Sequence, residues 1–318
     1  MDLLNTIIDF LQALWKALPG TFGQGMIWGI AAIGVFITYR LLDFADLTVD
    51  GSLATGGAVC VVLIKTAGMN PWLALLCAAG AGMLAGLVTG LFHTKCGIPA
   101  ILSGILTQLM LYSINLRIMK GNSQEAILVK KFPLLVSQRY VRDLTLDNPL
   151  PLILLIVAVL ACVLYWFFGT ERGCALRATG ANPNMARAQG INTKVNIVLG
   201  LMISNAIVAM AGAFLAQYTG AADVNMGRGA IVTALAAVII GEVVFGKISG
   251  SFLWKLAAVT LGAVIYFIVM QIIILMGLNT NDLKLITALV VAIFLAVPFW
   301  QGKLRAKVGR KLGGKKHA

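Results

Sequence analysis

Nine long apolar runs, each bounded by charged residues, glycine or proline, restrict what this chain can fold into. They cover residues 25–41, 47–65, 72–92, 98–116, 150–168, 197–218, 230–245, 251–276 and 283–300. A hydrocarbon layer about 30 Å thick needs about 20 apolar residues per crossing helix, and backbone polar groups in lipid must find their partners within that helix. The runs therefore predict an all-α, polytopic bundle of transmembrane helices with nine spans.

The composition supports one membrane domain over residues 1–300. Hydrophobic residues make up 59% of the chain, charged residues 12%, and the mean hydropathy is +0.92, values outside the range of soluble domains. Residues 1–18 place leucine and isoleucine on one helical stripe and polar residues elsewhere, which predicts an amphipathic helix. This helix either lies at the membrane interface or forms a short tenth span, and the tenth span is the favoured interpretation.

The net charge of +13 is concentrated where it sets topology rather than binds nucleic acid. Seven basic residues fall within residues 303–318, and basic residues beside a final span favour the cytoplasmic side. Residues 301–318 are therefore predicted to be a basic cytoplasmic tail. Counting spans backwards places residues 169–196 inside, where four basic residues stand against one acidic residue. Residues 117–149 and 219–229 are placed outside, although the basic surplus of residues 117–149 disagrees.

Small residues recur on one face of the third run. Gly82, Gly86 and Gly90 follow Ala78 at intervals of four, so a neighbouring helix can approach closely along this face. Tight packing inside the bundle is the expected reason, and a seam between two copies of the chain is the alternative.

Candidate catalytic groups are sparse. The sequence shows no Ser/His/Asp set, no paired carboxylates in a polar segment and no clustered metal ligands. Residues 241–247 match the first seven positions of a phosphate-binding loop, but Ile248 stands where a serine or threonine must hold magnesium, and an apolar helix replaces the required strand. We therefore predict that the chain is not an enzyme and holds no metal, cofactor or ATP.

Acidic residues near the second run are candidate path residues, because charge at membrane depth is costly and suggests function. Asp43, Asp46 and Asp50 would share a helical face, although the glycine at 51 suggests that the segment is broken. They either cap the next helix at the cytoplasmic interface or form a gate on a solute path. The candidate gate residues are Asp46, Thr48, Asp50 and Ser52.

Other polar side chains within the runs allow two interpretations. They could line a path for a solute, or they could form hydrogen bonds between helices. These residues are Ser103, Gln108, Ser204, Asn205 and Gln217.

The polar stretch over residues 169–196 is the most informative element. Asn182 suits a helix cap, Pro183 a first helical turn and Gly190 a stop, which together predict a helix of about seven residues. Such a helix has too little apolar surface to be stable alone, so we interpret it as a docking piece for a soluble partner.

This stretch resembles the cytoplasmic coupling segment in permease subunits of bacterial ATP-binding-cassette importers of the branched-chain amino acid and ribose type. The matching positions are Gly173, Arg177, Ala178, Gly180, Asn182, Ala186, Arg187, Gly190, Ile191 and Asn192. A second match is the segment from Asp46 to Ser52, which carries Asp50 as an insertion relative to the family pattern. The likeness covers residues 25–116 and 150–300.

The resemblance implies a type II importer-like fold with nine or ten spans in the bacterial cytoplasmic membrane, working by alternating access. It implies a second permease chain in a homodimer, cytosolic subunits that hold ATP-Mg, and an extracytoplasmic solute-binding protein. The Leu-Thr-Val-Asp-Gly-Ser variant looks like a branch linked to aromatic amino acid uptake. The residues implied in coupling to the ATPase are Arg177, Gly180, Asn182, Ala186, Arg187 and Gly190.

Two other functions remain open from the residues. An ion-gradient-driven secondary transporter would need carboxylates within the membrane, and Asp46, Asp50 and Glu242 are candidates. A channel or structural scaffold would explain only the hydrophobicity. Neither alternative explains the docking-like stretch.

Overall fold

The computed structural model describes residues 2–127, 132, 134–138, 141, 148–246, 248, 250–276, 285–294 and 296, with only the backbone for residues 2–7. The elements in order are α1 (Asp2–Phe36), a π-helical turn η1 (Ile37–Leu41), α2 (Thr48–Ala67), α3 (Pro71–Thr94), α4 (Ala100–Ile118), β1 (Gln124–Ala126), α5 (Pro149–Gly169), α6 (Glu171–Ala181), α7 (Pro183–Ala188), α8 (Thr193–Thr219), β2 (Ala221–Asp223), α9 (Ala230–Phe245) and α10 (Phe252–Leu275). A further apolar helix covers Leu285–Phe294. The predicted tail at 301–318 lies outside the described residues.

Each predicted apolar run is helical over nearly all of its described residues, which confirms the all-α polytopic fold. Within the described residues, seven helices are long and apolar enough to cross a membrane, and α9 and the helix at Leu285–Phe294 are shorter. The predicted runs agree with the observed helices because a helix that crosses the hydrocarbon layer must be both long and apolar.

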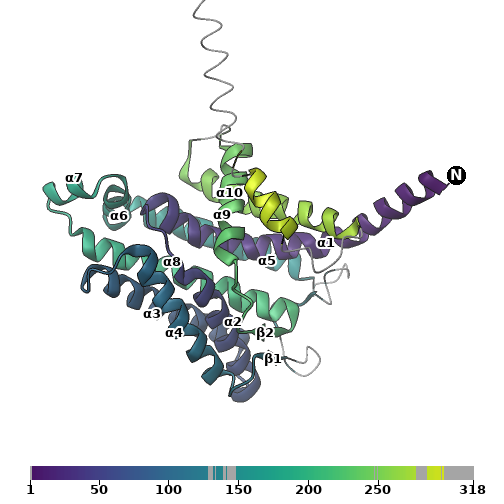
Figure 1. Cartoon of the computed structure of the whole chain (residues 1–318), viewed down its shortest axis with the longest axis horizontal. Coiled ribbons are helices and arrows are strands. Elements are labelled where there is room, and N and C mark those ends of the chain that lie inside the picture. Colours follow the sequence, from purple (N-terminus) through teal and green to yellow (C-terminus); the bar gives the residue numbers. More distant parts are fainter. Residues whose placement is uncertain are drawn as a thin grey trace, which may run out of the picture.

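The prediction of a separate tenth span at residues 1–18 is wrong. Helix α1 runs for 35 residues through Pro19 without a turn, and its first part extends away from the bundle (Figure 1). A proline inside a helix removes one hydrogen bond and costs about 3 kcal/mol. Packing beyond Pro19 offsets this cost, since a Cβ at Gly25 or Gly29 would lie within 2.8 Å of Val264 or Thr260 on α10.

Helix α8 lies at the centre of the fold and packs against α1, α2 and α3. The small-residue face of α3 meets it, because a Cβ at Gly82 would lie 2.2 Å from the carbonyl oxygen of Asn205, and one at Gly86 would lie 2.3 Å from that of Leu201. The prediction of tight packing inside the bundle is confirmed. A seam between two copies along this face is wrong, since α8 of the same chain covers it.

Short elements mark the two ends of the bundle. Helices α6 and α7 precede α8, and β2 follows it and pairs antiparallel with β1, with Glu125 opposite Ala222. The 27 residues of α8 separate these ends by about 40 Å at 1.5 Å per residue, and Figure 1 shows α7 and β1 at opposite extremes of the bundle. We call them the α7 end and the β1 end.

Candidate coupling element and solute path

Helices α6 and α7 form one capped unit at the α7 end. The side chain of Asn182 accepts hydrogen bonds from the backbone N–H groups of Asn184 (3.1 Å) and Met185 (3.0 Å), and Pro183 occupies the first turn of α7. Gly190 has a φ of +80° after the helix, a conformation that favours glycine. The predicted short helix, its cap and its stop are confirmed, with six residues in α7. Helix α6 was not predicted.

The α6–α7 unit rests directly on the membrane helices. A Cβ at Gly180 would lie 1.9 Å from the carbonyl oxygen of Leu41, so α6 touches the backbone at the end of η1. Arg187 donates from Nε to Thr193 Oγ1 at 2.9 Å, which ties α7 to the start of α8, and Ala186 is buried. A displacement of this unit therefore acts on both η1 and α8.

The predicted coupling residues are brought together, and most of them hold the unit in shape. Asn182 and Gly190 bound α7, Gly180 and Ala186 pack inward, and Arg187 binds α8. Arg177 is exposed, and its guanidinium lies 3.3 Å from Cys174 Sγ. Their role toward an ATPase stays a prediction.

The outer face of α7 carries a residue that the sequence did not single out. The side chain of Met185 is 64% exposed on a six-residue helix outside the bundle. Exposed methionine suits adaptable binding surfaces. The available signal was a large apolar side chain inside a polar stretch at a helix N-terminus.

Three of the predicted gate residues join a buried polar core between α2, α3, α4 and α8. Asp46 is 2% exposed and accepts hydrogen bonds from Thr48 N (2.9 Å) and from Asn205 Nδ2 (2.7 Å). Asn205 Oδ1 in turn accepts from Ser52 Oγ at 2.6 Å. As the capping interpretation predicts, Asp46 accepts a hydrogen bond from the first backbone N–H of α2. Its contact with Asn205, twelve residues into α8, places it about 18 Å along that helix rather than at its end.

Hydroxyl groups extend this polar core toward α4. Thr48 Oγ1 and Thr89 Oγ1 lie 2.7 Å apart, and Thr89 donates to Thr107 Oγ1 at 2.9 Å. All three side chains are buried. A network satisfied in this way fixes how α2, α3 and α4 meet. We define the polar core as Asp46, Thr48, Ser52, Thr89, Thr107 and Asn205.

The predicted break in the acidic segment lies at residues 42–47, before α2 begins, and Gly51 is within the helix.

Asp50 is separate from the polar core. Its carboxylate accepts hydrogen bonds from Gly229 N and Ile231 N, each at 3.0 Å, and so caps α9. Residues 219–229 were predicted to form an outside loop. Gly227 and Gly229 do not belong to a loose loop, because both contact Asp50 within the bundle; the side of the membrane that this segment faces stays a prediction.

The other flagged polar side chains divide between the two interpretations. Ser204 donates to Gly34 O, and the amide of Gln217 bonds to Leu135 N and Cys60 Sγ, so these are contacts between segments. Ser103 donates to Ala100 O within its own helix. Gln108 lines a cavity of about 300 Å³.

That cavity contains Asp50 and lies between α2, α4 and the segment before α9. Its wall also includes Tyr112, Asn115 and Arg228. Asn115 is 1% exposed, and neither its Nδ2 nor its Oδ1 has a hydrogen-bond partner. The sequence did not identify Asn115 or Arg228 as candidate site residues. A single polar residue near the end of a helix, such as Asn115, and a single basic residue in a loop, such as Arg228, are both common.

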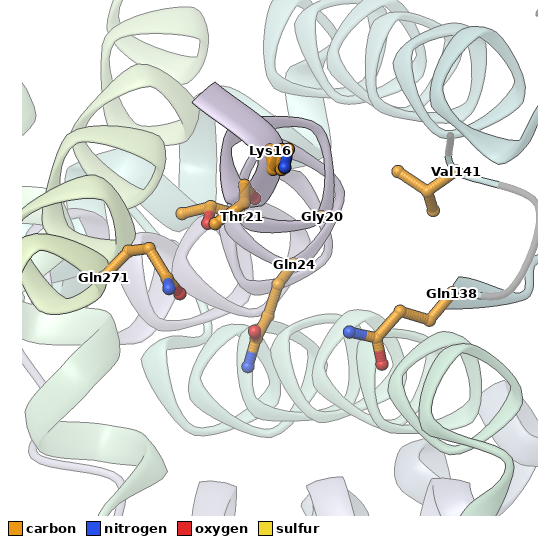
Figure 2. Close-up of a pocket in the computed structure, with 8 residues that line it drawn as sticks. Lys16, Gly20, Thr21, Gln24, Gln138, Val141 and Gln271 are labelled. Atoms are coloured by element: carbon orange, nitrogen blue, oxygen red, sulfur yellow. The ribbon is translucent and has the colours of Figure 1, made fainter. Parts of the chain in front are cut away.

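A second polar cavity, of about 370 Å³, lies beside α1 toward the β1 end. Figure 2 shows Gln24, Gln138 and Gln271 around it, with Lys16 and Thr21 from the same helix as Gln24. Three amides, one hydroxyl and one ammonium group contribute to the lining, which suits a hydrated opening.

Ion pairs lie near both ends. Arg40 Nε contacts Glu242 Oε1 at 2.9 Å toward the α7 end, and Lys65 Nζ contacts Glu125 Oε1 at 2.5 Å at the β1 end. The hydrogen bond from Lys65 holds the pKa of Glu125 below its ordinary value. Asp46, Asp50 and Glu242, the candidates for ion-gradient coupling, therefore lie in three different environments. No metal-ligating cluster occurs in the part of the chain that the structure describes.

The fold and these sites define a class: a polytopic membrane permease with a polar interior and a short helical unit at one end of the bundle. The chain belongs to the permease family described as the permease component of the branched-chain amino acid transport system, which it matches over residues 18–311. Permeases of this family work with an ATPase that is a separate subunit, and with a substrate-binding protein. The chain is accordingly an inner-membrane, multi-pass subunit.

Relatives carry different cargo names. The chain is 41% identical over 273 residues to the tyrosine transport system permease protein of Clostridioides difficile, covering 86% of this chain and 88% of that protein. It is 35% identical to the uncharacterized protein RP368 of Rickettsia prowazekii, covering 86% and 94%. It is 27% identical to the fructose import permease protein FruF of Bifidobacterium longum, covering 90% and 80%.

Proposed function

We propose that this chain is the membrane-spanning subunit of an ATP-driven importer of an amino acid. The observation that carries the proposal is the α6–α7 unit, a polar helical pair outside the bundle whose exposed tip is Met185 and whose base touches Leu41. Family membership supports a separate ATPase. The 41% identity to a tyrosine permease favours an amino acid over a sugar.

In the proposed mechanism two copies of the chain form a homodimer around the solute path. Closure of the cytosolic ATPase pair moves the α6–α7 units, and their contacts with η1 and α8 carry the motion into the bundle. Alternating access then needs contacts that differ between the two states. A binding protein delivers solute at the β1 end. The α7 end, and with it the carboxyl terminus, faces the cytoplasm.

We expect uptake to follow ATP rather than ion gradients. The permease, its ATPase and its binding protein would be reconstituted into liposomes, and uptake of radiolabelled L-tyrosine, L-leucine and D-fructose measured. ATP should drive uptake of an amino acid, and ionophores should leave it unchanged. Uptake by the permease without the ATPase, or uptake of fructose alone, would contradict the proposal.

A further inference from the structure

Asp50 and Arg228 lie near the middle of the bundle, far from both ends. Lys65, which is ion-paired at the β1 end, is fifteen residues beyond Asp50 on α2, about 22 Å away at 1.5 Å per residue. Helix α9 begins at Ala230, and Glu242, paired toward the α7 end, lies about 18 Å along it. Both charged groups therefore lie at membrane depth.

Arg228 is exposed on the single chain, and it forms no ion pair among the described residues. The neighbouring Gly227 holds Arg228 close to Asp50, because a Cβ at Gly227 would lie 1.9 Å from the carbonyl oxygen of Asp50. A cation at this depth is expensive unless it faces water or an opposite charge. The position indicates that Arg228 borders a hydrated path and offers an unpaired guanidinium to it.

Asp50 and Asn115 supply complementary groups to the same cavity. Each carboxylate oxygen of Asp50 accepts one hydrogen bond from a backbone N–H at the start of α9, and each can accept a further hydrogen bond. Asn115 is fully buried with donor and acceptor both unpartnered. Buried amides in folded proteins are almost always bonded, so an unpartnered buried amide that lines a cavity indicates a binding site for a polar ligand.

We propose that this cavity, lined by Asp50, Gln108, Tyr112, Asn115 and Arg228, binds the ammonium and carboxylate groups of a zwitterionic α-amino acid during transport. Arg228 binds the carboxylate, Asp50 accepts from the ammonium group, and Asn115 bonds to either. This inference rests on the proposed import function and names the chemistry that its path recognises.

The charge pattern distinguishes an amino acid from a sugar. A sugar offers only neutral hydroxyl groups, so it would form an ion pair with neither Arg228 nor Asp50 at membrane depth. A zwitterion neutralises both protein charges and carries no net charge of its own. The cavity of about 300 Å³ also lies at the small end of the range for small-molecule sites.

The test uses the reconstituted complex with saturating binding protein, and measures L-tyrosine and L-leucine uptake together with ATP hydrolysis. Arg228→Gln and Asn115→Leu should each lower the amino acid transported per ATP by about tenfold or more, the effect of losing one charge-assisted hydrogen bond. Arg228→Lys should retain part of the transport, because it keeps the charge. ATP hydrolysis stimulated by the binding protein should persist.

Arg117→Gln is the matched control, because Arg117 is an exposed arginine two residues from Asn115 that does not line the cavity. It should transport as the wild type does. Absence of wild-type uptake would count against the proposed function itself. Normal uptake by the wild type, Arg228→Gln and Asn115→Leu alike would overturn only this site.

A binding measurement checks the zwitterion directly. L-tyrosine should raise the melting temperature of the detergent-solubilised permease–ATPase complex, whereas tyramine and 4-hydroxyphenylpropionate, which each lack one charged group, should not. Asn115→Leu should abolish the shift. Equal shifts with all three compounds, or no shift with L-tyrosine, would contradict the proposed recognition.

Discussion

Gly180→Val should strongly lower amino acid transport while ATP hydrolysis by the assembled complex continues. A Cβ at position 180 would lie 1.9 Å from the carbonyl oxygen of Leu41, so α6 must move away from η1 to admit the new side chain. Overpacking of this kind typically costs about 1–3 kcal/mol, and here it separates the partner-facing unit from the bundle. We expect amino acid uptake per ATP to fall by about tenfold or more, since each 1.4 kcal/mol is tenfold.

Gly169→Val is the control for this prediction. Gly169 ends α5 just before α6, and a Cβ there would meet no atom within 4 Å. This variant should transport normally. Both variants should elute as intact complexes from a size-exclusion column. If both then transport the same amount of amino acid per ATP, the contact between α6 and η1 does not couple ATP hydrolysis to transport.

Asp46→Leu should be the most destabilising change in the polar core. It leaves Thr48 N without its acceptor and removes one of the two partners of Asn205 Nδ2. Each buried group deprived of a partner costs about 1–3 kcal/mol. Thermal unfolding of the purified permease in detergent should therefore show a clearly lowered melting temperature.

A double-mutant cycle separates the network from general core damage. Asp46 and Asn205 are in direct contact at 2.7 Å, so the cost of Asp46→Leu with Asn205→Leu should be less than the sum of the single costs, by about 0.5–3 kcal/mol. Asp46→Asn should lie between wild type and Asp46→Leu, because its amide oxygen can still accept from Thr48 N. Strict additivity would mean that the pair does not act as a unit.

The sequence locates the membrane helices well for a simple physical reason. Lipid imposes length and hydrophobicity on every crossing helix, so the runs at 98–116 and 251–276 coincide closely with α4 and α10. Local capping chemistry is equally readable, and Asn182, Pro183 and Gly190 bound α7 as predicted.

What depends on tertiary position could not be predicted. Residues 227–229 look like part of an outside loop, yet they return into the bundle because Gly227 packs on Asp50. Arg228 and Asn115 become candidate binding residues only because the fold brings both to the wall of one cavity. Helix α6 has mixed polar and apolar residues with no clear stripe, so periodicity did not reveal it.

Crosslinking from α7 tests the central claim most directly. A photoreactive benzophenone amino acid would replace Met185 at the α7 end or, as a control, Met276 at the β1 end, where the side chain is similarly exposed (64% and 67%). Irradiation of membranes that contain the whole transporter should join the ATPase subunit to the chain from position 185 and not from position 276. A crosslink to the ATPase from position 276, or none from position 185 in a complex that transports, would contradict the account.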